Sequence, residues 1–340
     1  MRKIIDECFF QIQNGANIKQ GKVDGGFPIT RIETIANDRF NRDRMGYAGI
    51  TDLSKYESYI LEDEDLLMSH INSMQYLGRT VLYKKQDDEI IIHGMNLLRL
   101  RANRDIIIPG YAKYYFYGHS FRSQLRNIMK KSVNQASFAV KDLKKIKMEI
   151  PCLREQQKLV QVLDKIQKII DVKTKEIAKF DELVSARFVE MFGDPITNSK
   201  LLPIEKIEER YFLKAGITTK AEDIHDYLKD KYEIPCYGGN GIRGYVENLS
   251  YEGCYPIIGR QGALCGNVQY ATGKFHATEH AVLVSILKND NTMWVYYMLK
   301  LMDLYRYHTG AAQPGLAVKK LNTIDVIVAD INLQNQFATF

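Results

Sequence analysis

The strongest constraint on the fold is a segment that occurs twice in the chain. The stretch SFAVKDLKKIKMEIPCLREQQ begins at Ser137, and the similar stretch GLAVKKLNTIDVIVADINLQNQ begins at Gly315. Ala139 matches Ala317 in this pairing, a separation of 178 residues. Similarity in a fixed order at so long a period is typical of a duplicated domain with a connector and is too long for the unit of a solenoid.

The match extends beyond these stretches. After two inserted residues, Leu153 and Gln156 fall on Leu333 and Gln336. Further upstream, Gly78 falls on Gly266, and residues 96–98 correspond to residues 280–282. The two halves diverge much more between these points. Halves that share their edges and differ in the middle favour one scaffold that carries two different recognition surfaces.

A long helix is predicted between the two halves. Apolar side chains recur every seven residues from 154 to 192, with charges at most of the other positions, which is typical of a coiled coil. At ~1.5 Å per residue the helix would be roughly 55–60 Å long. Its apolar stripe needs a partner, although a core helix inside one domain is an alternative. The predicted subunit-interface residues are Leu163, Ile166, Ile170, Ile177, Phe180 and Val184.

The composition excludes several classes of protein. The chain has 340 residues, 45% of them hydrophobic, but no uninterrupted apolar stretch of ~18 residues, so no membrane contact is expected. The first residues do not resemble a signal peptide. Its five cysteines form no CxxC pair, which indicates reduced thiols, a cytoplasmic location and no zinc site.

The distribution of charge suggests a polyanion as ligand. The formal net charge is only +6. Between Lys113 and Lys147, however, nine basic residues face a single acidic one, Asp142, and the aromatic run Tyr114–Tyr117 lies beside them. A solvated surface would normally mix both signs, so the pattern favours a surface that binds nucleic acid.

The sequence contains no convincing catalytic motif. It lacks the phosphate-binding GxxxxGK[ST] loop, a GxGxxG dinucleotide motif, the [DN]PP[YF] tetrapeptide of adenine methyltransferases and a GxSxG elbow. His276 and His280 have the spacing of two metal ligands, but no third ligand is identifiable, so a polar surface near the ligand is preferred. We therefore expect no catalytic residue, no metal and no cofactor.

Three glycine-rich loops in the second half are the best candidates for a DNA-binding surface. They cover residues 237–245, 258–268 and 308–316, and each contains Arg or Gln, the side chains that pair bidentately with guanine and adenine. Each loop alone is equally consistent with a tight turn between strands. With their thinner counterparts in the first half, they give the predicted DNA-binding residues: Ser69, His70, Asn72, Arg79, Asn96, Lys130, Lys131, Asn134, Gln135, Asn240, Arg243, Arg260, Gln261, His276, His280 and Gln313.

Taken together, these elements resemble the DNA-specificity subunit of Type I restriction-modification systems. The resemblance covers nearly the whole chain. It rests on YGGNGIRGY, IGRQGALCGNV and TGAAQPGLAV in the second half, on INSMQYLGRTVLY in the first, and on IPCLREQQKLVQVLDKI at the junction. INLQNQFATF at the end is similar to the start of that family's distal conserved helix.

The resemblance implies a mixed α/β fold with two target-recognition domains, residues 1–150 and 194–330, each binding one part of a split double-stranded DNA target. Residues 151–193 would be the central conserved coiled-coil helix, and residues 331–340 the start of the distal one. The partners would be methyltransferase subunits, which use S-adenosylmethionine, and restriction subunits. The chain itself would be non-catalytic.

One feature departs from the family's pattern. The distal helix stops at Phe340 after about two turns, so the resemblance implies a chain truncated within that helix, with self-association through the central helix as a way to cover its apolar stripe.

Two other functions stay open: a DNA methyltransferase or nuclease fused to its own recognition domains, and a coiled-coil interaction protein without a nucleic-acid role.

Overall fold

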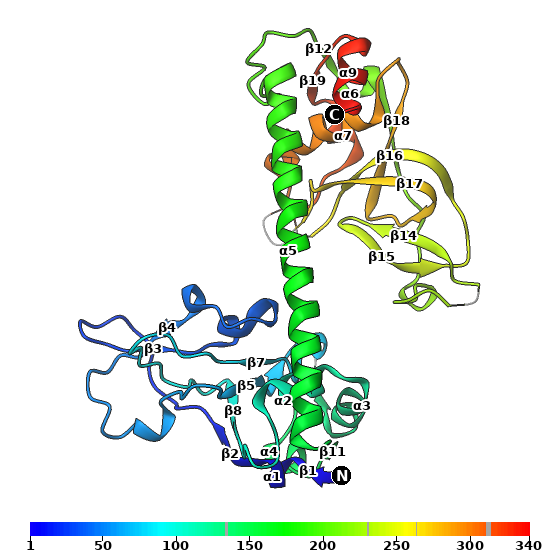
Figure 1. Ribbon diagram of the computed structural model, residues 1–340. Helices are drawn as coiled ribbons and strands as arrows, with labels where there is room; N and C mark the ends of the chain where they lie inside the picture. Colours follow the sequence, from blue (N-terminus) through cyan, green and yellow to red (C-terminus); the bar gives the residue numbers. More distant parts are fainter. Residues whose placement is uncertain (133–134, 230, 263, 311–313) are drawn as a thin grey trace. The chain divides into compact units, whose positions relative to one another are not determined.

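The chain divides into two compact units, Met1–Val172 (unit 1) and Lys173–Phe340 (unit 2). The computed structural model describes all residues except 133–134, 230, 263 and 311–313 (Figure 1). Both units combine helices with strands, and α5 (Leu153–Phe192) is the predicted long helix, so the mixed α/β fold is confirmed. No helix in the described part of the chain is both long and apolar enough to cross a membrane.

A four-stranded antiparallel sheet forms the centre of unit 1. Its strands lie in the order β2 (Phe9–Asn14), β8 (Leu97–Ala102), β5 (Leu66–Ser69) and β7 (Thr80–Leu82). Successive side chains of a strand point to opposite faces. On one face, Met68 and Leu98 pack with residues of α2 (Pro109–Tyr117) and α3 (His119–Ile128) in a single apolar core.

Residues 17–65 cover the other face of this sheet, and we call them the covering segment. They contain only the short strands β3 (Pro28–Ile29) and β4 (Gly46–Tyr47) and several 3-10 turns. Ile35 and Leu61 of the covering segment pack against Leu67, Val81 and Leu97 of the sheet. The sheet of unit 1 is therefore enclosed between two helices and a largely irregular segment.

Unit 2 contains a larger sheet of six strands. Their order is β13 (Tyr211–Ala215), β18 (Ala281–Ile286), β16 (Tyr251–Gly259), β17 (Val268–Ala277), β14 (Ile234–Gly238) and β15 (Gly241–Val246). Trp294 of α7 (Thr292–Leu301) packs on one face together with Phe188 and Phe192 from the end of α5. Tyr237, from the hairpin formed by β14 and β15, packs against the apolar core on the other face.

The first four strands of unit 2 repeat the sheet of unit 1. Gly15 donates its amide to the Leu97 carbonyl (3.3 Å), and Gly216 donates to the Ala281 carbonyl (2.9 Å), so β8 and β18 start at equivalent residues. A small antiparallel pair also recurs: β1 (Arg2–Ile4) with β11 (Lys147–Glu149), and β12 (Ile204–Lys206) with β19 (Asp325–Ile327). The same order and pairing show that one arrangement occurs twice in the chain.

The repeat continues into the helices without a gap. The buried Gln156 near the start of α5 accepts a hydrogen bond from the Ile108 amide (2.8 Å), and Gln334 of α9 (Ile331–Ala338) accepts one from the Asn291 amide (2.8 Å). Gln156 therefore matches Gln334 at the constant separation of 178 residues.

The two-residue insertion inferred from the sequence is accordingly wrong. Gln336, the residue paired with Gln156 on sequence, lies exposed on the outer side of α9, and so does Leu333. The segment LQNQ offers two glutamines, and only the packing distinguishes the buried one.

Candidate nucleic-acid interface

Two of the glycine-rich loops of unit 2 meet at the end of β16. Arg260, the first residue after this strand, donates its amide to the His280 carbonyl (3.0 Å) and accepts from the Leu316 amide (2.8 Å). Gly262 donates to the Pro314 carbonyl (2.9 Å). The main chain thus holds the loops 258–268 and 308–316 side by side.

The third glycine-rich loop, the turn between β14 and β15, lies against the same strand end. A Cβ on Gly259 would be 2.1 Å from the Gly239 carbonyl oxygen, so only glycine permits this approach. Beside it, the Asn267 side-chain amide donates to Oδ1 of Asn240. The described parts of the three loops singled out in the sequence therefore lie together at one strand end.

Unit 1 has an equivalent surface. The Phe138 amide donates to the His70 carbonyl (3.2 Å), just as the Leu316 amide donates to Arg260, so His70 occupies the position of Arg260. Next to it, three short strands pair in the order β6 (Ile71–Asn72), β10 (Ala136–Ser137) and β9 (Lys130–Lys131). This small sheet brings predicted residues from two distant parts of unit 1 together.

Most of the predicted DNA-binding residues lie on these two surfaces. Those with exposed side chains are Asn96, Lys130, Lys131, Gln135, Asn240, Arg243 and Gln261, and those half-buried are Asn72, Arg79, Arg260 and His280. Among the described residues, no carboxylate forms an ion pair with Lys130, Lys131, Arg243 or Arg260. Asn134 and Gln313 lie outside the described residues. The available groups include hydrogen-bond donors suited to phosphates and base edges.

Two of the predicted contact residues point inward instead. The fully buried Ser69 donates its hydroxyl to the Tyr76 carbonyl (2.6 Å). His276 is buried between the hydroxyl groups of Thr219 (2.8 Å) and Ser250. Both side chains hold loops together, so they are less available to DNA than the exposed candidates. A polar residue at a strand end gives the same signal whether it faces solvent or a neighbouring loop.

His70 is also largely buried, and this changes its chemistry. Burial lowers the pKa of His70 below its ordinary value, as it does for His276. A neutral imidazole cannot act as a cationic phosphate contact. At the position where unit 2 has the charged Arg260, unit 1 therefore has an uncharged ring.

The aromatic residues of the basic run do not form a stacking surface. Phe116 and Phe121 belong to the core of unit 1. The Tyr117 hydroxyl donates to Asp38 (2.8 Å), and that of Tyr114 donates to Asp164 of α5 (2.6 Å). Lys130 and Lys131 are among the exposed basic residues of this run.

The described residues of the two surfaces are mainly hydrogen-bonding and basic groups. Within the described ranges, no three His, Cys, Asp or Glu side chains are grouped so that they could hold an ion. Burial raises the pKa of the Cys236 thiol to about 11, which makes it a poor nucleophile. The arrangement is suited to binding.

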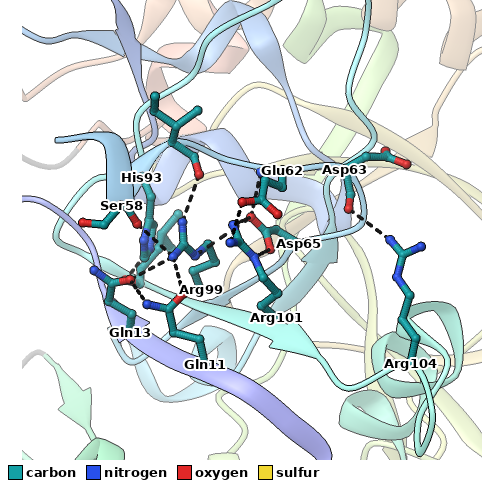
Figure 2. A network of polar contacts seen from close by, with 12 residues as sticks. Gln11, Gln13, Ser58, Glu62, Asp63, Asp65, His93, Arg99, Arg101 and Arg104 are labelled. Atoms are coloured by element: carbon teal, nitrogen blue, oxygen red, sulfur yellow. Dashed lines mark hydrogen bonds and ion pairs between the residues drawn. The ribbon is translucent and has the colours of Figure 1, made fainter. Parts of the chain in front are cut away.

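A buried polar network holds the covering segment of unit 1 on its sheet (Figure 2). Arg99 of β8 is 1% exposed and donates to the side chains of Gln11 (2.7 Å) and Gln13 (2.8 Å). It also donates to the carbonyls of Ser58 (2.9 Å) and Ile60 (3.0 Å) in the covering segment. The sequence does not single out Arg99, because an arginine in the strand pattern LLRLRA is typical of a solvent-facing position.

Two further residues of the surfaces were missed, Asp38 and Asn267. Asn267 directly follows Gly266, as Arg79 follows Gly78, so extending the sequence match by one residue would have found it. No signal in the sequence points to Asp38, which comes from the covering segment and contacts Arg79 only in the folded unit.

Comparison with known proteins agrees with this geometry. A family model described as the Type I restriction modification DNA specificity domain matches residues 7–181. The EcoprrI specificity subunit of a Type I restriction enzyme from Escherichia coli is 36% identical over 244 residues, 65% of this chain and 58% of that one. The putative MjaX specificity subunit from Methanocaldococcus jannaschii is 32% identical over 58% of this chain and 46% of that one. The chain thus spans about half the length of these relatives.

The fold has a counterpart among solved structures. The crystal structure of a Type I restriction-modification S subunit from M. genitalium superposes with a TM-score of 0.52, at 14% identity, over all of this chain and 87% of that one. At this identity the likeness concerns the fold. Because the family model covers residues 7–181 of the 340, the chain belongs to the Type I restriction modification DNA specificity domain family.

Proposed function

We propose that this chain is the specificity subunit of a Type I restriction-modification complex and binds a bipartite double-stranded DNA target. The observation that carries the proposal is the repeated surface: loops at equivalent strand ends of both units expose unpaired basic and amide groups. Residues 1–150 and 194–330 would be the two target-recognition domains, with the helix of residues 151–193 between them and a second conserved helix starting at residue 331.

The chemistry of the exposed groups divides the contacts into two kinds. Lys130 and Lys131, which have no carboxylate partner among the described residues, are suited to phosphates. Arg243, Arg260 and Gln261 lie on glycine-rich loops that allow close approach to base edges. The first kind would supply salt-dependent affinity, and the second would supply sequence preference.

The partners would dock on the middle of α5. Ile166, Ile177 and Phe180 are 47%, 69% and 65% exposed, and Ile170 is exposed as well. Leu163 is half-buried, and Val184 packs against the core of unit 2, so these two of the predicted interface residues are less available to a partner. We propose that methyltransferase subunits, which use S-adenosylmethionine, and restriction subunits bind there, and that the chain itself carries no catalysis.

A binding selection tests the proposal. The full chain is mixed with a randomised duplex library, and the bound DNA is sequenced. We expect a target of two short conserved parts separated by a spacer, with an affinity that falls steeply as salt rises. Replacing residues 200–325 with the matching domain of a relative should change one part and leave the other intact. Recovery of no preferred sequence would refute the proposal.

A further inference from the structure

One position recurs at the edge of both surfaces, directly after a glycine with positive φ. Gly78 (φ +72°) donates its amide to Ser69 (2.8 Å), and Gly266 (φ +83°) donates to Gly259 (2.7 Å). The next residue then accepts from the same strand end: Arg79 in unit 1 (2.9 Å) and Asn267 in unit 2 (2.8 Å). Arg79 and Asn267 therefore occupy the same place in the two units.

In unit 1, a residue of the covering segment holds the side chain at this position. Nε of Arg79 lies 2.9 Å from Oδ1 of Asp38. The guanidinium carbon of Arg79 also lies 4.3 Å from the centre of the Tyr76 ring, a cation–π distance. With an ion pair on one side and an aromatic ring on the other, the guanidinium group has a fixed orientation.

Asp38 is itself held in place by its surroundings. The Tyr117 hydroxyl donates to Oδ1 of Asp38 (2.8 Å). Asn37 and Asp38 both have φ +58°, in the left-handed region that residues other than glycine occupy sparsely. Strained backbone of this kind persists only where the surrounding structure holds it, and it is concentrated at functional sites.

In unit 2, the side chain at this position is held by a segment that has no counterpart in unit 1. The Asn267 side-chain amide donates to Oδ1 of Asn240, which lies in the turn between β14 and β15. This hairpin belongs only to unit 2, as the covering segment belongs only to unit 1. In each unit, the part that differs most between the two halves supplies the group that orients the shared position.

We infer that Arg79 and Asn267 are specificity-determining residues that contact base edges, and that Asp38 and Asn240 are positioning residues acting through them. The inference rests on the proposed function and deepens it. Asp38 occupies Nε of Arg79 and leaves the two terminal nitrogens, which match O6 and N7 of guanine. Asn267 keeps its Oδ1 and one amide hydrogen, which match N6 and N7 of adenine.

The alternative is that these pairs only brace their loops. A bracing pair affects the stability of the loop but not the base that is preferred opposite it. The two explanations therefore differ in the sequence selected by the variants, as well as in affinity.

The test compares selections from a randomised duplex library by the full chain and by its variants. Arg79→Lys keeps the charge but cannot pair bidentately, so the guanine preference at one position should be lost and affinity for the wild-type target should fall roughly 5- to 100-fold. Asn267→Ala should remove an adenine preference from the other part of the target. Each variant should leave the opposite part unchanged.

Asp38→Asn examines the positioning role. It should broaden the same guanine position, whereas Asp43→Asn, an equal change of charge at an exposed residue of the covering segment, should not. If Asp38 acts through Arg79, the double variant Asp38→Asn/Arg79→Lys should bind no more weakly than Arg79→Lys alone. Additive losses would overturn the positioning role. The Asp38 side chain is 54% exposed, so the variant should fold, and circular dichroism checks this.

Failure of this inference differs from failure of the proposed function. If the wild-type chain selects no sequence, both fail. If it selects a split target and the Arg79→Lys and Asn267→Ala variants select the same target at every position, only the present inference is overturned.

Discussion

Each unit has its own sheet, with four strands in the same order, but the side chains buried against the two sheets differ in polarity. In β8 of unit 1, Arg99 is buried beneath the covering segment and bonded to four oxygen acceptors. The equivalent residue of β18 in unit 2 is Leu283, which packs in an apolar core beside Phe275 and Tyr237. The same strand position therefore holds a buried, hydrogen-bonded arginine in one unit and an apolar side chain in the other.

Near the start of α9 in unit 2 and of α5 in unit 1, the difference is reversed: two buried side chains are polar in unit 2 and apolar in unit 1. In unit 2, Arg210 forms a buried ion pair with Asp290 (2.8 Å), and Gln334 donates to the same carboxylate (2.7 Å). The matching residues of unit 1 are Cys8 and Ile107, both in the apolar core. The main-chain pairing is retained in both units, while buried side chains change between polar and apolar where the polar ones find hydrogen-bond partners.

The largest expected loss of stability is that of unit 2 when Asp290 is replaced. Asp290→Ala leaves the guanidinium of Arg210 buried without its main partner, so unit 2 should lose about 3–5 kcal/mol of unfolding free energy. Trp294 is the sole tryptophan and lies in the core of unit 2, so its fluorescence during urea unfolding reports this unit alone. Asp325→Ala, which removes only the surface ion pair with Lys206, should change little. Equal effects of the two variants would contradict the contrast.

The next effect is expected in unit 1. Arg99→Met leaves Oε1 of Gln11 and the carbonyls of Ser58 and Ile60 without their donor, whereas Oε1 of Gln13 keeps the hydrogen bond from Gln11. Unit 1 should lose about 2–3 kcal/mol of unfolding free energy. Hydrogen exchange of covering-segment peptides should speed up. The urea unfolding transition of unit 2, measured by Trp294 fluorescence (the Trp294 transition), should stay unchanged. Leu283→Met, the same replacement in unit 2, should cost less than about 1.5 kcal/mol because it substitutes one apolar side chain for another. A covering segment that keeps its protection would show that Arg99 does not hold it.

A smaller effect should appear at the buried glutamines that the units share. Gln156 and Gln334 each accept from a main-chain amide and donate to a main-chain carbonyl near the start of a helix. Gln156→Ala and Gln334→Ala should each destabilise their own unit by about 1–2 kcal/mol. Only the Gln334 variant should shift the Trp294 transition. Surface variants Gln157→Ala and Gln336→Ala serve as controls and should have no measurable effect.

The smallest expected difference between the units is in how their stability depends on acidic pH. Hydrogen bonds from Arg42 lower the pKa of Glu89 in unit 1 to about 2, from an ordinary 4.5. Burial acts to raise the pKa of Asp290 in unit 2, but hydrogen bonds from Arg210 and Gln334 prevail and lower it. A carboxylate with a depressed pKa stabilises the fold above its unfolded pKa and loses that contribution as pH falls toward the folded value.

Both units should therefore become less stable as pH falls below the ordinary carboxyl values, and the Glu89 contribution should be lost between about pH 4.5 and about pH 2. Glu89→Gln should make the stability of unit 1, measured by hydrogen exchange, depend less on acidic pH. The pH dependence of the unfolding of unit 2, measured by Trp294 fluorescence, should stay unchanged. A variant that altered the acid dependence of both units would show that Glu89 does not act within unit 1 alone.

Local patterns predicted a large part of the fold. The heptad pattern predicted α5, and the repeated AVK segments predicted that one arrangement occurs twice, because helical period and repeated order are visible in the sequence. The close contact between the main chains of Gly239 and Gly259 was not predicted from the glycine-rich loops, whose glycines suggested close approach to a ligand. The side chains at strand ends were less predictable: Ser69 and His276 turned inward, and Asp38 was not foreseen.

The sequence by itself determined the elements, the duplication and the loops that contain the candidate DNA contacts, since these depend on residues close together or on a repeat of the same order. The tertiary structure alone decided which glutamine of LQNQ is buried, that Arg99 lies inside the unit, and that Asp38 orients Arg79. Each of these depends on a partner distant in the chain, and the free energy of burying a polar group depends on whether that partner is present.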